Sequence, residues 1–293
     1  MKKQILAKEI PAGKRTFTLV LEKEDLSAIY PGFLRFTLTV GLAGAPEGSA
    51  VAIFRTNTYE YAPGVQLRAE EVALEKSAEW ELEIRADPDG FLEQNLPGAR
   101  PAAESTRYDV VIVQGSPRAG GNSGTLAAWA EETAQGQGMS CTVLYPHELD
   151  IHECIGCYQC FNTGSCIYDD DMAGIIDAVS RCRLLVICTP VYTNTAPANL
   201  KMLIDRFQSY FAAQTLGMAV PGKTNGVILA VSGRPGQENF LCVRKELTAF
   251  FNIAGITPAG NVFIDGVDRI RDIRELPGCR EKVTGLVAEN LVP

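Results

Sequence analysis

The chain has 293 residues and a formal net charge of −8. This charge argues against a nucleic-acid partner, because a phosphate backbone is bound by clustered Lys and Arg, and the sequence has no such cluster. No run of about eighteen apolar residues occurs, and Lys8 and Glu9 interrupt the short apolar stretch at the start, so we expect no membrane span and no signal peptide. These features predict a cytoplasmic protein with no membrane partner.

The distribution of cysteine divides the chain into two predicted domains. All nine cysteines lie between Cys141 and Cys279, and residues 1–105 contain none. In a reducing compartment such thiols are expected as ligands, redox groups or buried side chains, and disulfides are disfavoured. We expect a domain of unknown role over residues 1–105 and a second domain over residues 106–293, joined by a Pro-rich linker at 95–106.

Residues 1–105 are predicted to form a small all-β domain, either a sandwich or a barrel. Three segments rich in aromatic and β-branched residues, at 16–21, 33–40 and 79–85, are separated by Pro, Gly and Asp turn signals. In the third, Trp80, Leu82 and Ile84 alternate with charged residues, which is typical of a strand with one buried face.

From residue 108 onward, short β-branched runs alternate with amphipathic segments. The predicted strands are 109–114, 142–145, 184–189, 226–231 and 262–265, and the predicted helices are 126–134, 173–179, 200–211 and 243–251. Five such units predict an α/β fold, a flavodoxin-like doubly wound five-stranded parallel sheet, in which ligands bind in the loops after the strands. The apolar stripe of 200–211 is interpreted as core and not as a cofactor site.

The loop after the first of these strands, residues 114–125, has the character of a phosphate site. It is neither a dinucleotide fingerprint nor a Walker loop, because it lacks their glycine spacing. Its glycines, its hydroxyls at Ser116, Ser123 and Thr125, and Arg118 precede a helix whose free N–H groups favour an anion. A single phosphate monoester fits best. The alternative is a structural turn with Asn122 or Ser123 as the helix cap.

The loop after the third strand, residues 189–201, carries Tyr192 among short polar residues. Such a segment suits a flat, hydrogen-bonding ring system with Tyr192 against its face, although it could equally serve only to end the strand.

Four cysteines, Cys154, Cys157, Cys160 and Cys166, fall within thirteen residues in a Cys-x2-Cys-x2-Cys-x5-Cys pattern. Thiolates are soft ligands, so this density predicts a metal or redox site. Structural zinc and thiols without any metal remain open, although tandem spacing disfavours zinc. The remaining cysteines, Cys141, Cys182, Cys188, Cys242 and Cys279, are expected in the core.

Three further groups near the cysteine loop receive structural interpretations. Asp169, Asp170 and Asp171 are expected to cap the helix that starts at Met172, in preference to binding metal. Both histidines, His147 and His152, are expected at the surface. No Ser-His-Asp triad or paired-carboxylate site is evident, so no catalytic side chain is assigned.

Several motifs occur in the order found in NADPH-dependent FMN reductases, and residues 107–265 resemble that family, above all its iron-sulfur flavoproteins. The motifs are Gly115-Ser-Pro-Arg, Gly121-Asn-Ser, the cysteine loop ending Cys166-Ile-Tyr-Asp-Asp-Asp-Met, Thr189-Pro-Val-Tyr, and Leu200-Lys-Met-Leu-Ile-Asp-Arg. The resemblance implies that the FMN phosphate is held by Ser116, Arg118, Asn122, Ser123 and Gly124.

The same resemblance implies the rest of the site. The isoalloxazine would be bordered by Pro190, Val191, Tyr192 and Thr193, with Ser232 and Gly233 completing its pocket. The cysteine loop resembles one that holds a 4Fe-4S cluster, and the superfamily usually forms homo-oligomers.

Together these features predict an FMN-dependent oxidoreductase or electron-transfer flavoprotein. It would pass electrons between NAD(P)H or a ferredoxin-like donor and a second acceptor, with a 4Fe-4S cluster as an open addition. The alternatives are a non-enzymatic flavin or iron-sulfur redox sensor and a zinc-stabilised interaction protein.

Overall fold

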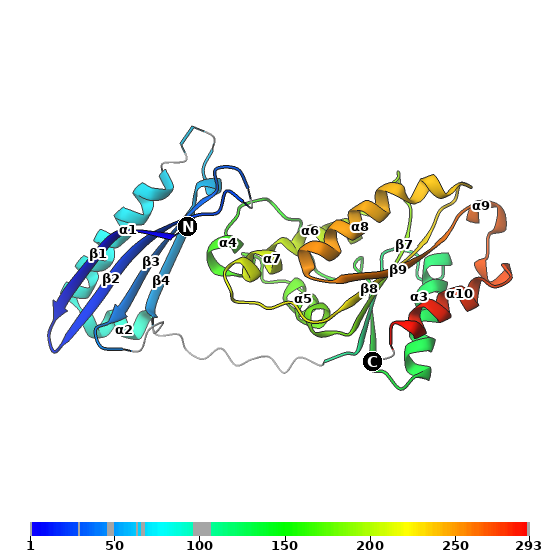
Figure 1. Ribbon diagram of the computed structural model, residues 1–293, viewed down its shortest axis with the longest axis horizontal. Helices are drawn as coiled ribbons and strands as arrows, with labels where there is room; N and C mark the ends of the chain where they lie inside the picture. The colour runs from blue at the N-terminus through cyan, green and yellow to red at the C-terminus, as the bar shows by residue number, and fades with distance from the viewer. Residues whose placement is uncertain are drawn as a thin grey trace. The chain divides into compact units, whose positions relative to one another are not determined.

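The computed structural model describes residues 2–28, 30–45, 50–62, 64–65, 68–95 and 107–291. The chain divides into two compact units, Met1–Ala102 with Gly156–Ser165, and Ala103–Ile155 with Cys166–Pro293 (Figure 1). The predicted linker at 95–106 lies outside the described residues except for Asn95, which ends a helix.

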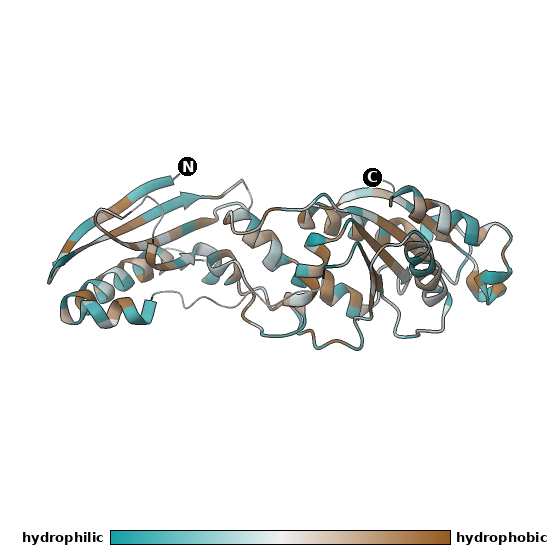
Figure 2. Ribbon diagram, turned by 90° about the horizontal axis from the view of Figure 1, so that it is seen from below, coloured by the Kyte–Doolittle hydropathy of each residue, from teal (hydrophilic) through white to brown (hydrophobic). Residues whose placement is uncertain are grey.

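The first unit contains one antiparallel sheet and a helical layer. Its strands β1 (Lys2–Ala12), β2 (Arg15–Asp25), β3 (Leu34–Leu42) and β4 (Ala50–Asn57) pair in chain order. They are followed by η1 (Thr58–Glu60), α1 (Arg68–Ala86) and α2 (Pro88–Asn95), and Figure 2 shows the helices along one face of the sheet. Alternate residues of the strands are buried against α1, as in Phe17, Leu19 and Leu21 of β2. The predicted β domain is confirmed in its sheet.

The prediction of a strand at 79–85, and with it a sandwich or barrel, is wrong. These residues belong to α1, whose buried side chains are spaced by three or four residues, at Ala69, Ala73, Ser77, Trp80 and Ile84. Leu82 is 69% exposed, although strand alternation would have buried it beside Trp80. Over seven residues an alternating pattern also fits one helical stripe, and only the longer register from Ala69 separates the two.

The segment Gly156–Ser165 groups with the first unit although the chain enters it from the second. Its short helix α4 (Cys160–Thr163) places Phe161 in full burial. Phe161 and Tyr158 join a cluster of five rings with Tyr30, Phe33 and Tyr59, at centroid distances between 5.1 and 6.3 Å. Such aromatic pairs add to the burial of apolar area and hold the segment in place.

Hydrogen bonds also attach the segment Gly156–Ser165 to the rest of the first unit. The side-chain Oδ1 of the buried Asn162 accepts from Asn57 Nδ2 at 3.1 Å, and the Asn162 backbone carbonyl accepts from Arg55 Nη1 at 2.9 Å. Glu60 accepts from Gln159 Nε2 at 3.1 Å and also from the Asn162 side chain. Burial raises the pKa of Glu60 even though these hydrogen bonds act to lower it.

The second unit is a parallel sheet between two helical layers. Strands β5 (Val110–Gln114), β6 (Cys141–Leu144), β7 (Leu184–Pro190), β8 (Asn225–Val231) and β9 (Thr257–Ile264) lie in the order β6-β5-β7-β8-β9. The predicted doubly wound five-stranded sheet is confirmed. The inner strands β5, β7 and β8 are covered on both faces, so their residues are almost continuously buried, which explains their β-branched runs. The edge strands β6 and β9 are only partly buried.

The helices of this unit form two layers. One contains α3 (Asn122–Gly136) and α10 (Cys279–Glu289). The other contains α5 (Met172–Arg181), α6 (Ala198–Arg206), α7 (Gln208–Thr215) and α8 (Leu241–Ala254). The single helix predicted at 200–211 is two, because Phe207 ends α6 and opens α7. Within the described ranges, no helix is both long and apolar enough to cross a membrane.

Four of the five cysteines outside the loop are covered as predicted. Cys182, Cys188 and Cys279 are buried and Cys141 is half-buried; burial raises the pKa of Cys141 to about 11 and that of Cys182 to about 12. Such thiols are poor nucleophiles. The prediction for Cys242 is wrong, because it is exposed in the first turn of α8, one position before the buried stripe that begins at Val243.

Alanine substitutions at residues 80 and 82 test the helical register of α1 directly. We expect Trp80→Ala to lower the free energy of unfolding of the first unit by about 3–5 kcal/mol, since the indole packs against Phe54 and Phe91. Leu82→Ala should change it by less than about 0.5 kcal/mol because Leu82 faces solvent. Urea unfolding followed by far-UV circular dichroism, which does not rely on tryptophan fluorescence, measures both. Comparable losses of unfolding free energy in the two variants would contradict the helical register.

Candidate functional site

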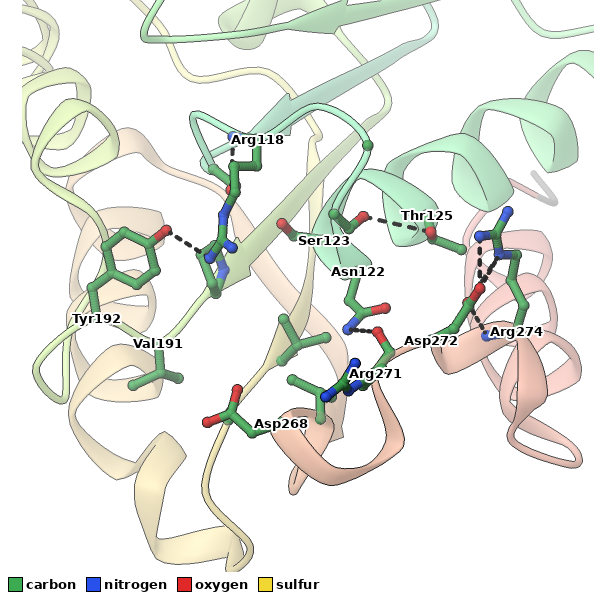
Figure 3. Close-up of a pocket in the computed structure, with 17 residues that line it drawn as sticks. Arg118, Asn122, Ser123, Thr125, Val191, Tyr192, Asp268, Arg271, Asp272 and Arg274 are labelled. Carbon is green, nitrogen blue, oxygen red and sulfur yellow. Dashed lines mark hydrogen bonds and ion pairs between the residues drawn. The ribbon is translucent and has the colours of Figure 1, made fainter.

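A cavity of about 480 Å³ opens at the carboxyl ends of the strands in the second unit (Figure 3). Its volume lies within the range of small-molecule sites, roughly 300–1,000 Å³. It sits where the chain leaves β5 for β6 on one side and then returns to β7 on the other, which is the switch point of the sheet. It is lined by Ser116, Arg118, Gly120, Gly121, Asn122, Ser123, Thr125, Pro190, Val191, Tyr192, Val231, Gly233, Val267, Asp268, Arg271, Asp272 and Arg274.

The loop between β5 and α3 forms the polar wall of this cavity. Its turn is fixed by the Ser116 N–H, which donates to Gln114 Oε1 at 2.8 Å, and by Ser116 Oγ, which accepts from the Arg118 N–H at 3.1 Å. Helix α3 then begins at Asn122, and the N–H groups of its first turn have no partner within the helix. Those N–H groups and the helix dipole favour an anion at this end of the cavity.

Gly124 is required by the way the loop folds back on α3. A Cβ added at this position would lie 1.7 Å from Ala119 O, which is backbone and cannot rotate away. At Gly120, in the same loop, an added Cβ meets nothing within 4 Å. The loop is therefore held tightly against the start of its helix at one glycine and not at the other.

The loop after β7 supplies the opposite wall. Tyr192 is 37% exposed, and its hydroxyl lies 3.4 Å from Arg118 Nη2 (Figure 3). Tyr192 and Thr195 pair across a tight turn whose central residues, Thr193 and Asn194, have φ of 45° and 69°. Positive φ is strained for a β-branched residue such as Thr193. The turn continues into Ala196, whose N–H donates to Glu246 Oε2 at 3.1 Å.

Most of the predicted cofactor residues come together around the cavity. Those that line it are Ser116, Arg118, Asn122, Ser123, Pro190, Val191, Tyr192 and Gly233. Three others do not: Gly124, Thr193 and Ser232. Ser232 is buried, and its hydroxyl donates to Arg234 O at 3.3 Å. Gly233 borders Asp268, whose carboxylate would lie 2.4 Å from a Cβ at that position.

Residues after β9 also line the cavity, and the sequence reasoning missed them. Asp268 lies in α9 (Val267–Ile270), and Arg271 directly follows this helix. Asp272 is the N-cap of η3 (Ile273–Glu275), and Arg274 lies within it. Arg274 pairs with Asp272 through Nε at 2.9 Å and Nη2 at 2.6 Å. A usable signal was present, since three arginines follow the carboxyl end of a predicted strand within a few residues.

None of the four loop cysteines forms a disulfide in the structure. Cys154 is exposed and the other three are half-buried. Cys157 and Cys160 group with the first unit, whereas Cys154 and Cys166 group with the second. Among the described residues, no three His, Cys, Asp or Glu side chains are gathered as a metal site would need.

The acidic run before α5 has a structural role centred on Asp170. Its Oδ1 accepts from the Met172 N–H, the first of the helix, at 3.2 Å, whereas Asp171 at the N-cap position makes no side-chain cap hydrogen bond. The Asp170 carboxylate also forms a buried pair with Arg206 at 2.6 and 3.0 Å. Burial alone would raise the pKa of Asp170, but the bonds from Arg206, His152 N and Met172 N outweigh it and lower the pKa to about 2. His152 itself is half-exposed and stacks on Tyr168. The His147 side chain is 23% exposed, less than its predicted surface position implies.

The two glycines of the loop offer a matched pair of substitutions. We expect Gly124→Ala to lower the free energy of unfolding by about 1–3 kcal/mol, because its methyl group must displace the Ala119 carbonyl. Gly120→Ala should be nearly neutral, because its methyl group enters open space. Thermal unfolding of the full chain measures both, and equal stability of the two variants would refute the close approach at Gly124.

Comparison with known proteins places this geometry in context. A family model for NADPH-dependent FMN reductase matches residues 108–267. An iron-sulfur flavoprotein of Methanocaldococcus jannaschii is 27% identical over 153 residues, covering 52% of this chain and 76% of that protein. Another from Archaeoglobus fulgidus is 28% identical over 150 residues, covering 51% of this chain and 65% of that protein, slightly less than two thirds of its length.

A solved structure shares the fold of the second unit. It is an FMN-dependent NADH-azoreductase from Bacillus anthracis in complex with FMN, with a TM-score of 0.50, 14% identity, and coverage of 62% of this chain and 99% of that chain. At this identity the likeness shows the fold alone. Because the family model spans more than half of the 293 residues, the chain belongs to the NADPH-dependent FMN reductase family and is an FMN-dependent oxidoreductase.

Proposed function

We propose that the cavity of the second unit binds FMN and that the protein uses it to oxidise NAD(P)H and reduce a second acceptor. The observation that carries this proposal is the meeting of two loops at the switch point: the glycine-bearing loop at the start of α3 and the Tyr192 loop after β7. One offers an anion site and the other a partly apolar wall with an aromatic ring. A phosphorylated ring compound needs both.

The residues present fit FMN on chemical grounds. Ser116, Arg118, Asn122, Ser123 and Gly124 would hold the phosphate, with Gly124 allowing the loop to close around it. Pro190, Val191, Tyr192 and Thr193 would border the isoalloxazine, and Ser232 and Gly233 would complete the pocket. Arg118 has a further use, because its guanidinium lies against the Tyr192 hydroxyl and so orients the aromatic ring.

The chain needs to supply binding and orientation more than proton transfer. When bound, flavin supplies two-electron exchange with a nicotinamide and one-electron exchange with other acceptors. Around the cavity, Asp268 and Asp272 are the carboxylates, and Asp272 is already paired with Arg274. We therefore assign no general acid or base and expect the protein to act by holding the two nucleotides in register.

The proposal extends to the partners. The electron donor would be a nicotinamide nucleotide, which the family name supports, or a ferredoxin-like protein. We also propose that the protein is cytoplasmic and works as a homo-oligomer.

Turnover of the purified protein tests the enzymatic proposal. With added FMN, we expect NAD(P)H oxidation, followed at 340 nm with a quinone as acceptor, to depend on both flavin and protein. Ser116→Ala combined with Arg118→Ala should raise the flavin concentration needed for half-maximal rate by at least about tenfold, since charge-assisted contacts are lost. Tight flavin binding without turnover would instead support a redox sensor, and no flavin binding would overturn the proposal.

A second candidate function is electron transfer through a 4Fe-4S cluster on Cys154, Cys157, Cys160 and Cys166. Two observations favour it: the tandem spacing of the four cysteines, and the names of the relatives, which include an iron-sulfur flavoprotein of Methanosarcina thermophila that is 31% identical over 94 residues, 32% of this chain and 49% of that protein. The placement of the described cysteines does not add to this support.

Iron and acid-labile sulfide assays on anaerobically purified protein separate the alternatives for these thiols. We expect about four of each per chain if the cluster is present, and their loss in Cys157→Ser. Cys242→Ser is the control, because Cys242 is exposed but lies on α8, outside the loop. Zinc without sulfide would support a structural site, and protein free of both would leave a reductase that relies on flavin alone.

A further inference from the structure

We infer that Arg271 is a second phosphate-binding arginine of the flavin site and that Asn122 acts by positioning it. The inference rests on the proposed function, since it names residues that hold the FMN phosphate. It departs from that proposal in one respect, because it makes Asn122 a support for another ligand-binding residue.

Arg271 is held in a strained backbone conformation. Its φ and ψ are 65° and −44°, and the Asp272 N–H donates to Ile270 O at 2.8 Å across it. This is a γ-turn with positive φ at the centre, which is rare for a residue with a side chain. Strain of this kind persists only where the surrounding structure enforces it, and such residues cluster at ligand sites.

Asn122 holds this turn from a distant part of the chain, in addition to the Arg271 N–H, which donates to Val267 O at 2.8 Å. Its Nδ2 donates to Arg271 O at 3.0 Å, and its Oδ1 accepts from the Ile273 N–H at 3.2 Å, so one amide grips the turn on both sides of Asp272 (Figure 3). Asn122 is also the first residue of α3. The phosphate loop and the turn after β9 are therefore tied together across 149 and 151 positions of sequence.

The ion pairs around the cavity leave Arg271 available to bind an anionic group. Of the three arginines that line the cavity, Arg274 is paired with Asp272, and in the described part of the chain no carboxylate forms an ion pair with Arg118 or Arg271. Arg118 enters the cavity from the loop after β5, and Arg271 enters from the turn after β9 beside Asn122 (Figure 3). A phosphate monoester carries about −1.5 to −2 charges at neutral pH and can accept from two guanidinium groups at once.

Direct titration of apoprotein with FMN and with riboflavin tests the inference, because riboflavin has the same ring but no phosphate. We expect Arg271→Ala to raise the Kd for FMN by about tenfold or more, the range for a lost charge-assisted bond, and to leave the Kd for riboflavin within about twofold. Arg269→Ala is the matched control, since Arg269 is exposed in α9, the short helix that Arg271 follows, and does not line the cavity. It should leave both constants unchanged.

The role of Asn122 is separable from that of Arg271 by a double-mutant cycle. If Asn122 acts through Arg271, Asn122→Ala should weaken FMN binding by itself but add less than about twofold when Arg271 is already alanine. Additive losses would show that Asn122 contacts the ligand directly and would overturn its positioning role. Arg271→Gly should melt at a higher temperature than Arg271→Ala, because glycine relieves the positive φ, and it provides a folded variant for the same titrations.

The outcomes distinguish this inference from the proposed function. Failure of the wild-type protein to bind either flavin would overturn both. Tight FMN binding that is unchanged in Arg271→Ala and Arg271→Gly would overturn the inference alone, as would equal losses for FMN and riboflavin, which would indicate a structural effect. A rise in the KM for NADPH without a change in the Kd for FMN would assign Arg271 to the second nucleotide and would also overturn it.

Discussion

The loop between β5 and α3 comes so close to its own helix that residue 124 has no room for a side chain. Ala119 O occupies the position that a Cβ would need, so the carbonyl and the first turn of α3 are in direct contact. This approach turns the N–H groups of the helix start, the hydroxyl of Ser123 and the Arg118 side chain toward one cavity. The Tyr192 loop and the turn after β9 then close that cavity from two other strand ends.

The order of the strands explains why these particular loops meet. In a parallel sheet all carboxyl ends lie at one edge, and the chain crosses from one side of β5 to the other between β6 and β7. The loops after β5 and β7 therefore diverge and leave a space between them. The Tyr192 hydroxyl accepts from Arg118 Nη2 across this space, and this hydrogen bond connects the loops after β5 and β7. The Asn122 amide makes a second contact, with the turn after β9.

Sequence patterns predicted the elements whose signal lies within a few neighbouring residues. They failed where the structure depends on a longer stretch of chain or on contacts between residues far apart in the sequence. The five parallel strands were visible because burial on both faces demands continuous β-branched runs, as in Val110–Gln114. Loop 114–125 was visible because glycines and hydroxyls directly follow such a strand. By contrast, Trp80 and Ile84 suit a short strand as well as a helix, and only the spacing back to Ala69 distinguishes them. The arginines after the last predicted strand indicate a charged loop, but the position of Arg271 in the cavity also depends on its contact with Asn122, 149 residues earlier, which local patterns do not contain.

An acidic protein that binds an anionic cofactor needs its positive charge placed locally. The net charge of −8 is spread over the whole chain, and at physiological salt charges farther away than about 8 Å are largely screened. What the cavity presents is set by the groups around it: a helix start, two arginines without an ion-pair partner in the described residues, and a third neutralised by Asp272. Among the described residues that line the cavity, the Arg274–Asp272 pair leaves Arg118 and Arg271 as the positive charges without an ion pair, and Asp268 is the remaining carboxylate. Because those two arginines belong to the first and the last loops of the sheet, a phosphate between them would also hold these loops together.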